Sequence, residues 1–317
     1  MDPQPLSPAR LRVVPETRDQ ALIAFQFRPD EASPLSVGCA RLAGPDGESW
    51  LAGAVGESAE TRGAALAHGE HYAMVALVVD EVHGDIETAA AQAYERLLVA
   101  VRPSEHPYLL RIWNYFPAIN RGEGDQERYR RFCVGRARAV DGMFNDPPPA
   151  ATAIGADGEP GRLQVVALCS RTPAVAIENP RQTPAWQYPR EHGPVSPGFS
   201  RGALLDTDTD TPRLLASGTA SIVGHVSQHL GDCAAQLRES LANLDELIAQ
   251  AAEKTGKPFQ RAGCEAMRVY LRSEADLAAA QAVMSGSGIP PACITYLRGD
   301  ICRRELDVEL EGVFAAG

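Results

Sequence analysis

The order of apolar segments repeats along the chain, and this repetition constrains the fold more than any other feature. In the first half, an apolar run at 72–79 predicts a buried strand, and 86–101 predicts a helix because apolar side chains recur every three or four residues. A strand over 108–116 and a helix over 126–140 are predicted to follow. Strands and helices in this order predict an α+β fold, with helices packed on one face of a mixed sheet.

The second half repeats the plan. Asp232 is expected to be the N-cap of a long helix that Gly256 ends, and Ser273 is expected to cap a shorter one. The predicted strands are 163–169, 214–223, 267–271, 294–297 and 306–310, and the predicted helices are 232–255 and 274–284.

The segment 145–161 is the best candidate for a boundary between the halves, because it is rich in proline, glycine and small residues. A chain of 317 residues suits two domains of roughly 150 residues each. We therefore expect domains at 1–148 and 149–317. The alternative is that 145–161 is a long surface loop inside one compact unit.

Composition excludes several classes of protein. The net charge of −11 argues against a surface for nucleic acid or anionic membrane. The seven cysteines are odd in number and contain no CxxC motif, which argues against a disulfide framework or a cysteine zinc site. The N-terminus has no apolar signal region, and the longest apolar run is too short to span a bilayer, so a cytoplasmic location is expected.

The last predicted strand alternates acids with aliphatic residues. Its apolar side chains are expected to enter the core, while Glu305, Asp307, Glu309 and Glu311 form an acidic row on the other face. A carboxyl group held in a cleft can act as a general acid. The alternative is a charged face in contact with solvent.

Two segments are candidates for a binding site. The stretch 128–138 holds five arginines and no acid, which suits an anion with more than one carboxylate, because each guanidinium can form two hydrogen bonds with one carboxylate. The alternative is a basic helix face that pairs with Glu123, Asp125 and Glu127. The segment 179–194 contains four prolines around Trp186 and Tyr188, and predicts a rigid loop that lines a pocket or is held by a buried tryptophan.

Other catalytic patterns are weak. The glycines of 216–225 do not have the spacing of a phosphate-binding loop, and the serines there lack the context of a hydrolase nucleophile. His225 and His229 are four residues apart but have no obvious third ligand, so no metal is expected. Cys302 precedes two arginines, which could lower its pKa, although a small core residue is the common role of cysteine.

Several blocks together resemble known families. Blocks similar to the RidA/YjgF fold are Ser217–Gly224, Gly231–Leu244, Val269–Arg272 and Val308–Glu311, and blocks similar to the chorismatases are Arg111–Asn120, Glu127–Arg136 and Trp186–Arg190. The resemblance implies two RidA/YjgF-like halves and covers most of the chain from 108 onward.

The resemblance also implies a reaction. Chorismatases release the enolpyruvyl side chain of chorismate as pyruvate, and leave either a dihydroxycyclohexadiene carboxylate or 3-hydroxybenzoate, in some cases 4-hydroxybenzoate. The family's catalytic acid matches Glu309 in the Val-Glu-Leu-Glu motif, and Glu311 is then expected to remain on a face in contact with solvent. The residues that the resemblance implies as ligands of carboxylate or hydroxyl groups are Tyr129, Arg131, Arg136, Tyr188 and Arg272. It implies no metal or redox cofactor.

Cys302 bears on the product. Hydroxybenzoate-forming members of the family carry a cysteine seven residues before the acid, and the same spacing separates Cys302 from Glu309. An odd spacing places two side chains on opposite faces of an unbroken strand. Either Cys302 lies before the regular strand, or a bulge intervenes, or the two residues do not act together.

The expected function is therefore that of a chorismatase forming 3-hydroxybenzoate. The alternatives are a hydrolase that leaves the dihydroxycyclohexadiene carboxylate and a RidA-like protein that binds an aromatic acid without turning it over. A RidA-type imine deaminase is disfavoured, because its arginine is missing from 290–295. The assembly is expected to be a trimer, as is common for this fold, or a monomer in which the two halves form the junction internally.

Overall fold

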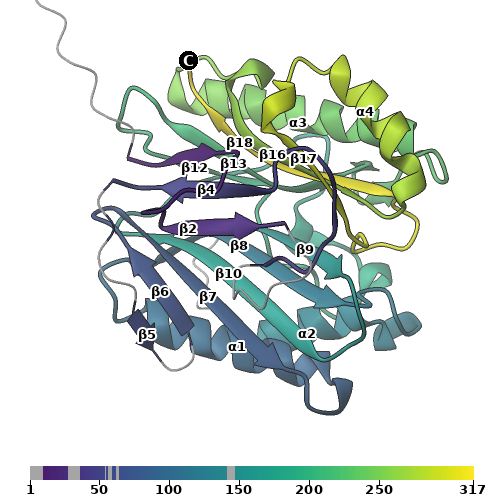
Figure 1. Ribbon diagram of the computed structural model, residues 1–317. Coiled ribbons are helices and arrows are strands. Elements are labelled where there is room, and N and C mark those ends of the chain that lie inside the picture. Colours follow the sequence, from purple (N-terminus) through teal and green to yellow (C-terminus); the bar gives the residue numbers. More distant parts are fainter. Residues whose placement is uncertain (1–9, 28–35, 54, 56–58, 62–63, 141–146) are drawn as a thin grey trace, which may run out of the picture.

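Two β-sheets face each other, and each carries two helices on its outer face, so the molecule has four layers (Figure 1). The computed structural model describes residues 10–27, 36–53, 55, 59–61, 64–140 and 147–317. The α+β class, with helices on one face of each mixed sheet, is confirmed. None of the described helices is long and apolar enough to cross a membrane.

The first half forms a sheet of six strands in the order β5-β6-β7-β10-β8-β9. Strands β8 and β9 pair in parallel, and the other neighbours pair antiparallel. The elements of this half are β5 (Ala59–Thr61), β6 (Ala64–His68), β7 (Tyr72–Asp80), α1 (Ile86–Val101), β8 (Tyr108–Pro117), α2 (Arg128–Val140), β9 (Ala150–Ala156) and β10 (Arg162–Ser170).

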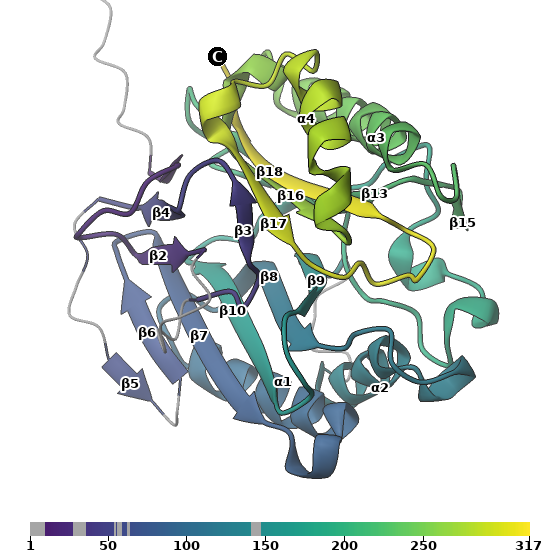
Figure 2. The same cartoon turned by 45° about the vertical axis from the view of Figure 1, so that its right-hand side comes forward.

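The second half repeats this plan in a sheet of seven strands, in the order β11-β12-β13-β18-β16-β17-β3. Here β16 and β17 are the parallel pair, and the strand added at the edge is β3 (Arg41–Ala43), which lies next to β17 (Figure 2). The other elements are β11 (Val175–Ile177), β12 (Gly202–Leu205), β13 (Arg213–Ala220), α3 (Cys233–Thr255), β16 (Cys264–Leu271), α4 (Leu277–Ser285), β17 (Ile294–Arg298) and β18 (Val308–Ala315).

The domain boundary expected at 148–149 does not coincide with the division between the two sheets. Strands β9 and β10 follow that boundary in the chain, yet both pair within the first sheet. We therefore propose that the division between the halves follows Ser170. The described part of the segment 145–161 contains the whole of β9, a largely buried strand, so it is not a long surface loop either.

Most helix boundaries agree with their sequence signals. The side chain of Asp232 accepts a hydrogen bond from the backbone N–H of Ala235 at 2.9 Å, and Gly256 ends α3 with a positive φ of 66°. Ser273 caps a short 3-10 turn instead of α4, so that α4 begins only at Leu277. The strand predicted at 214–223 is two elements, because β13 ends at Ala220 and β14 (Ile222–Val223) turns back against β15 (Val226–Ser227).

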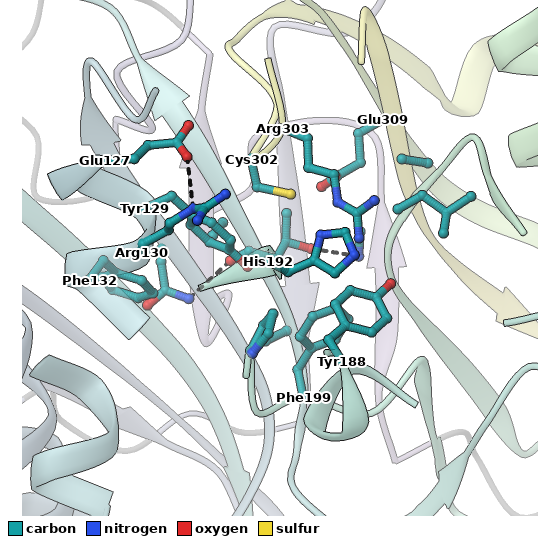
Figure 3. Close-up of a pocket in the computed structure, with 18 of the residues that line it drawn as sticks. Glu127, Tyr129, Arg130, Phe132, Tyr188, His192, Phe199, Cys302, Arg303 and Glu309 are labelled. Carbon is teal, nitrogen blue, oxygen red and sulfur yellow. Dashed lines mark hydrogen bonds and ion pairs between the residues drawn. The ribbon is translucent and has the colours of Figure 1, made fainter. Parts of the chain in front are cut away.

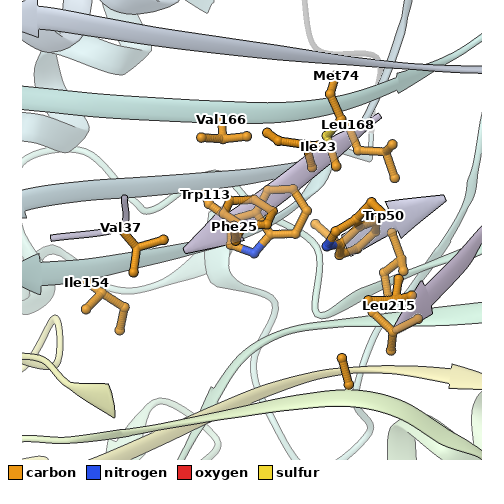
Figure 4. Close-up of a cluster of buried hydrophobic side chains, with 14 of the residues drawn as sticks. Ile23, Phe25, Val37, Trp50, Met74, Trp113, Ile154, Val166, Leu168 and Leu215 are labelled. Atoms are coloured by element: carbon orange, nitrogen blue, oxygen red, sulfur yellow. The ribbon is translucent and has the colours of Figure 1, made fainter. Parts of the chain in front are cut away.

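Aromatic side chains fill part of the space between the sheets. A small sheet of β1 (Arg12–Val14), β4 (Gly47–Leu51) and β2 (Ile23–Gln26) contributes Trp50 and Phe25, which pack edge-on against Trp113 of β8 (Figure 4). The ring centroids lie 5.2 and 5.5 Å from that of Trp113. Each such pair adds about 0.5–1.5 kcal/mol to the free energy that burial alone supplies.

A buried ionic network lies beside these rings. Arg268 of β16 forms ion pairs with Glu48 of β4 and with Glu311 of β18, and all three side chains are at most 5% exposed. Arg111 of β8 also pairs with Glu311, so the network joins both sheets and the small one. The hydroxyl of Tyr270 donates to Glu311 at 2.9 Å. Paired in this way, the charges avoid the large cost of isolated burial.

We expect Arg268→Met to lower the free energy of unfolding by about 3–5 kcal/mol, because it leaves Glu48 and Glu311 buried without their shared cation. The midpoint of thermal unfolding measures the effect. Arg298→Met is the matched control, since Arg298 forms a partly exposed pair with Asp157 that should contribute about 0–1 kcal/mol. Equal shifts in both variants would contradict a stabilising role for the network.

Candidate active site

A cavity of about 320 Å³ opens between the two halves. Its walls come from β8, β9 and α2 of the first half, from β13, β18 and the loop before β18 in the second half, and from the proline-rich loop between them (Figure 3). Its polar and aromatic lining residues are Asn114, Glu123, Glu127, Tyr129, Arg130, Phe132, Arg136, Thr152, Tyr188, His192, Phe199, Arg201, Cys302, Arg303, Arg304, Glu305 and Glu309.

Glu309 is the buried carboxyl group of the cavity. Its neighbours Val308 and Leu310 pack into the core beneath α3, so alternation along β18 turns Glu309 toward the first half. The side chain is only 4% exposed. Burial and the nearby charge of Glu311 raise the pKa of Glu309 to about 8, against the opposing effect of Arg111 and Arg201. The carboxyl group therefore carries a proton at neutral pH and can donate it.

The acidic row has unequal members. Glu305 is exposed and accepts from the hydroxyl of Ser227, and Asp307 exchanges hydrogen bonds with the side chain of Gln236 on α3. Glu311 was expected to face solvent, and that expectation is wrong: the side chain is 3% exposed because the first sheet covers this face of β18. Glu311 is the member whose charge helps to keep the proton on Glu309.

Gly218 of β13 leaves room for the Glu309 carboxyl group. A Cβ at this position would collide with that carboxyl group and lie 3.2 Å from Thr152 Oγ1. Thr152 Oγ1 accepts a hydrogen bond from the Gly218 N–H at 2.9 Å and donates one to Glu311. Through Thr152, the backbone of Gly218 beside Glu309 is thus linked to the buried ionic network.

Cys302 enters the same cavity from the loop before β18 (Figure 3). The regular strand begins only at Val308, which resolves the odd spacing: Cys302 lies before the strand and is free of its alternation. Burial, followed by the charge of Glu309, raises the pKa of the Cys302 thiol. The expectation of a lowered pKa is therefore wrong, because Arg303 has a smaller, opposing effect. The thiol is neutral.

Three arginines line the cavity without an ion pair to any carboxylate of the described residues: Arg136, Arg201 and Arg303. Arg136 and Arg201 are 5% and 3% exposed. Arg201 Nε and Arg303 Nη2 are buried and have no hydrogen-bond partner within the described part of the chain. Buried cations of this kind are costly unless an anion compensates them, so they suit an anionic ligand.

Some arginines of α2 face the cavity, as an anion-binding helix would place them, and others pair with acids. Arg136 faces the cavity, whereas Arg131 pairs with Asp85 at 3.0 Å and with Glu87 at 3.4 Å near the start of α1. Arg130 lines the cavity but pairs with Glu127 at 3.3 Å. The structure therefore does not bring Arg131 to the site, because acids on the neighbouring helix hold it.

Arg272 also lies outside the cavity lining. Its guanidinium donates to the side chains of Asn120 and Asp300 and to the backbone carbonyls of Ile301, Arg303 and Leu306, at 2.9–3.1 Å. These bonds engage every nitrogen of the group, which leaves no free direction toward a ligand. Arg272 holds the loop that carries Cys302 and Arg303.

Tyr129 and Tyr188, which the resemblance implied as substrate ligands, both line the cavity. Burial raises the pKa of Tyr129 well above its usual value, so its hydroxyl stays protonated. The hydroxyl of Tyr188 accepts a hydrogen bond from Arg201 Nη2 at 2.6 Å, and its ring lies 5.2 Å from the guanidinium carbon of Arg303. Trp186 is only half-buried and outside the lining, so it does not anchor the loop as a buried side chain.

Sequence reasoning missed Arg201, Arg303, Phe199 and His192. Arg201 and Phe199 have no local motif, and only the fold brings them to the cavity. Arg303 directly follows Cys302, which is a signal that could have found it. His229 pairs with Glu239 at 3.2 Å, so the pair His225 and His229 does not converge. His225 lies instead beside Glu191 and His192 at the rim of the cavity.

Comparison with known proteins gives consistent relatives. The family model described as "Chorismatase FkbO/Hyg5-like, N-terminal" matches residues 48–169. A 3-hydroxybenzoate synthase of Streptomyces hygroscopicus is 34% identical, over 86% of this chain and 83% of the relative. A chorismatase of Streptomyces rapamycinicus is 36% identical, over 84% of this chain and 82% of the relative. A crystal structure of a chorismatase aligns with a TM-score of 0.78 at 34% identity, covering 87% of this chain and 86% of the other.

Proposed function

The chain belongs to the chorismatase family, and on this premise we propose that it converts chorismate to pyruvate and 3-hydroxybenzoate. The observation that carries the proposal is a protonated, buried Glu309 in one cavity with three arginines that lack an acidic partner among the described residues. Chorismate is a dicarboxylate with an acid-labile enol ether, and so needs both features. The cavity volume of about 320 Å³ suits a ligand of that size.

Glu309 is the proposed general acid. Cleavage of the enol ether begins with transfer of a proton to the methylene carbon of the side chain, and an oxocarbenium ion develops at the neighbouring carbon. A carboxyl group with a pKa near 8 is protonated at neutral pH and is still acidic enough to donate. The carboxylate left on Glu309 after the transfer stabilises the positive charge that forms.

Arg136, Arg201 and Arg303 are proposed to bind the two carboxylates of the substrate. Guanidinium groups form paired hydrogen bonds with carboxylates, and Arg201 Nε and Arg303 Nη2 are buried donors without a partner among the described residues. Tyr129 is proposed to add a hydroxyl group beside Glu309 and Cys302. Such contacts hold the side chain of the substrate against the acid, which is the contribution of orientation to the rate.

The product depends on water. Pyruvate and 3-hydroxybenzoate together contain the same atoms as chorismate, whereas pyruvate and the dihydroxycyclohexadiene carboxylate together contain those of chorismate and one water molecule. Cys302 lies beside Glu309 with a neutral, weakly polar thiol. We propose that Cys302 disfavours attack by water and so favours aromatisation of the ring.

One chain is proposed to form a complete site. Both halves contribute to the cavity, with Tyr129 and Arg136 from the first and Gly218 and Glu309 from the second. The junction between repeated halves thus lies inside the chain, as expected for the monomeric alternative.

The direct test is incubation of the purified protein with chorismate, followed by an assay for pyruvate. Pyruvate in a one-to-one ratio with 3-hydroxybenzoate is the expected result. No pyruvate above background, with chorismate bound, would favour a binding protein, and the dihydroxycyclohexadiene carboxylate as main product would favour the hydrolase.

Glu309→Gln is expected to lower kcat by at least about 100-fold while chorismate still binds, because the amide keeps the shape of the side chain but cannot donate the proton. Steady-state kinetics and calorimetric binding measure the two effects. Glu253→Gln, on the exposed side of α3, is the control and should behave as wild type. Turnover of Glu309→Gln within a few-fold of wild type would remove Glu309 from this role.

The value of kcat/KM is expected to fall as pH rises through about 8. The folded protein holds the Glu309 proton below that pH and loses it above, and only the protonated form can donate. A pH profile of kcat/KM measures the inflection. An inflection near pH 4–5, the ordinary range of a glutamate, would show that burial does not set the acidity of the catalytic group.

Cys302→Ala is expected to change the ratio of 3-hydroxybenzoate to dihydroxycyclohexadiene carboxylate more than it changes total pyruvate, because the smaller side chain admits water beside Glu309. Chromatography of the products measures the ratio. Cys293→Ala is the matched control, since Cys293 is also half-buried but lies outside the cavity lining. An unchanged ratio in Cys302→Ala would count against a role in product choice.

A further inference from the structure

Three metal-binding side chains meet at the rim of the cavity. Glu191 and His192 belong to a short 3-10 turn (Arg190–His192) in the proline-rich loop, and His225 occupies the turn between β14 and β15. One ligand atom from each lies within 4.8 Å of the other two. From this geometry we propose that Glu191, His192 and His225 form a binding site for a divalent transition-metal ion such as Zn²⁺.

The distances fit a tetrahedral ion. His192 Nε2 lies 3.1 Å from His225 Nδ1 and 3.4 Å from Glu191 Oε1, and His225 Nδ1 lies 3.3 Å from the same oxygen. Zinc binds histidine nitrogen at about 2.0–2.1 Å, so ligands at the corners of a regular tetrahedron are about 3.3–3.4 Å apart. The three separations are thus close to the edges of such a tetrahedron.

Hydrogen bonding alone does not satisfy the cluster. Glu191 Oε1 accepts only, and each imidazole nitrogen either donates or accepts. If both nitrogens carry protons, they repel each other across the 3.1 Å contact; if one is unprotonated, its lone pair faces the carboxylate oxygen. With Glu191 ionised, no assignment of protons to the two imidazoles makes all three contacts favourable, whereas a cation between the three atoms does.

The two loops are fixed against each other. The N–H of Thr183 donates to the Gly224 carbonyl at 2.9 Å, and the N–H of Gly224 donates to the Arg181 carbonyl at 2.8 Å. The ring of His192 also packs on Tyr188 at 5.1 Å, and Arg303 donates to the backbone carbonyl of His225 at 2.8 Å. These contacts hold the ligands in place before a metal binds, which reduces the entropy that binding must overcome.

The types and number of ligands indicate which metal ion the site would bind. Two neutral histidines and one carboxylate suit Zn²⁺ and related ions better than Mg²⁺ or Ca²⁺, which prefer oxygen ligands. Arg303 and Arg130 are the charges that oppose a cation at His192, and Glu191 is the charge that favours it. Three protein ligands leave one position for water or a carboxylate. The site does not depend on the proposed reaction.

The test is a titration of the untagged full-length chain with Zn²⁺ by calorimetry, and with Co²⁺ by absorption spectroscopy. One Zn²⁺ per chain and the intense visible bands of tetrahedral Co²⁺ are expected. His225→Ala and Glu191→Gln should each weaken Zn²⁺ binding by at least about 10-fold. His229→Ala is the matched control, because His229 is four residues from His225 but pairs with Glu239, and its affinity should equal that of wild type.

Two results would overturn the site. One is Zn²⁺ binding of equal strength in wild type, His225→Ala and Glu191→Gln, which would assign the ion to other groups such as the half-buried thiols. The other is the absence of binding at micromolar Zn²⁺ in a wild-type chain whose circular dichroism shows it to be folded. Because both readouts are independent of turnover, failure of the metal site and failure of the proposed reaction are distinguishable.

Discussion

The ion pairs of Glu311 with Arg111 and Arg268 are the interaction on which the site depends. They keep a negative charge between the two sheets, two residues along β18 from Glu309 and on the same face. Burial alone raises the pKa of a carboxyl group, and a fixed charge of the same sign raises it further. The network therefore stabilises the fold, and its Glu311 charge favours the protonated form of Glu309 against a smaller opposing effect of Arg111. A cation paired directly with Glu309 would instead lower its pKa and favour the ionised carboxylate.

The sequence predicted elements better than it predicted what covers them. The apolar periodicity of α1 and α3 and the capping residue Asp232 were sufficient to locate those helices, because these signals are local. The exposure of Glu311 was predicted wrongly, because alternation along a strand defines two faces but not which of them meets another layer. That second layer is the first sheet, and it comes from residues about 150–200 positions earlier in the chain.

The same limit applies to the cations of the site. Five arginines between 128 and 138 suggested an anion-binding helix, but whether each one faces a ligand or an acid depends on tertiary contacts. Acids at the start of α1 hold Arg131, and loop carbonyls hold Arg272. Arg201 lies outside any motif and lines the cavity beside the proline-rich loop, where it donates to Thr183 and Tyr188. Glu309 was singled out as the candidate acid by a family motif, because the four acids of its row look alike in the sequence pattern.

The repeated halves differ in the central strand of the sheet, and only the second half places a buried acid on it. Strand β10 occupies the position in the first sheet that β18 occupies in the second, between the strands that precede and follow the first helix of each half. On the side facing the other sheet, β10 presents Gln164, Val166 and Leu168, whereas β18 presents Glu309 and Glu311. Strand β10 has no carboxyl group on that face, and the first half contributes instead cations and rings of α2. A second acid facing Glu309 across the cavity would compete with the substrate for Arg136, so this asymmetry is what a site for a dianion requires.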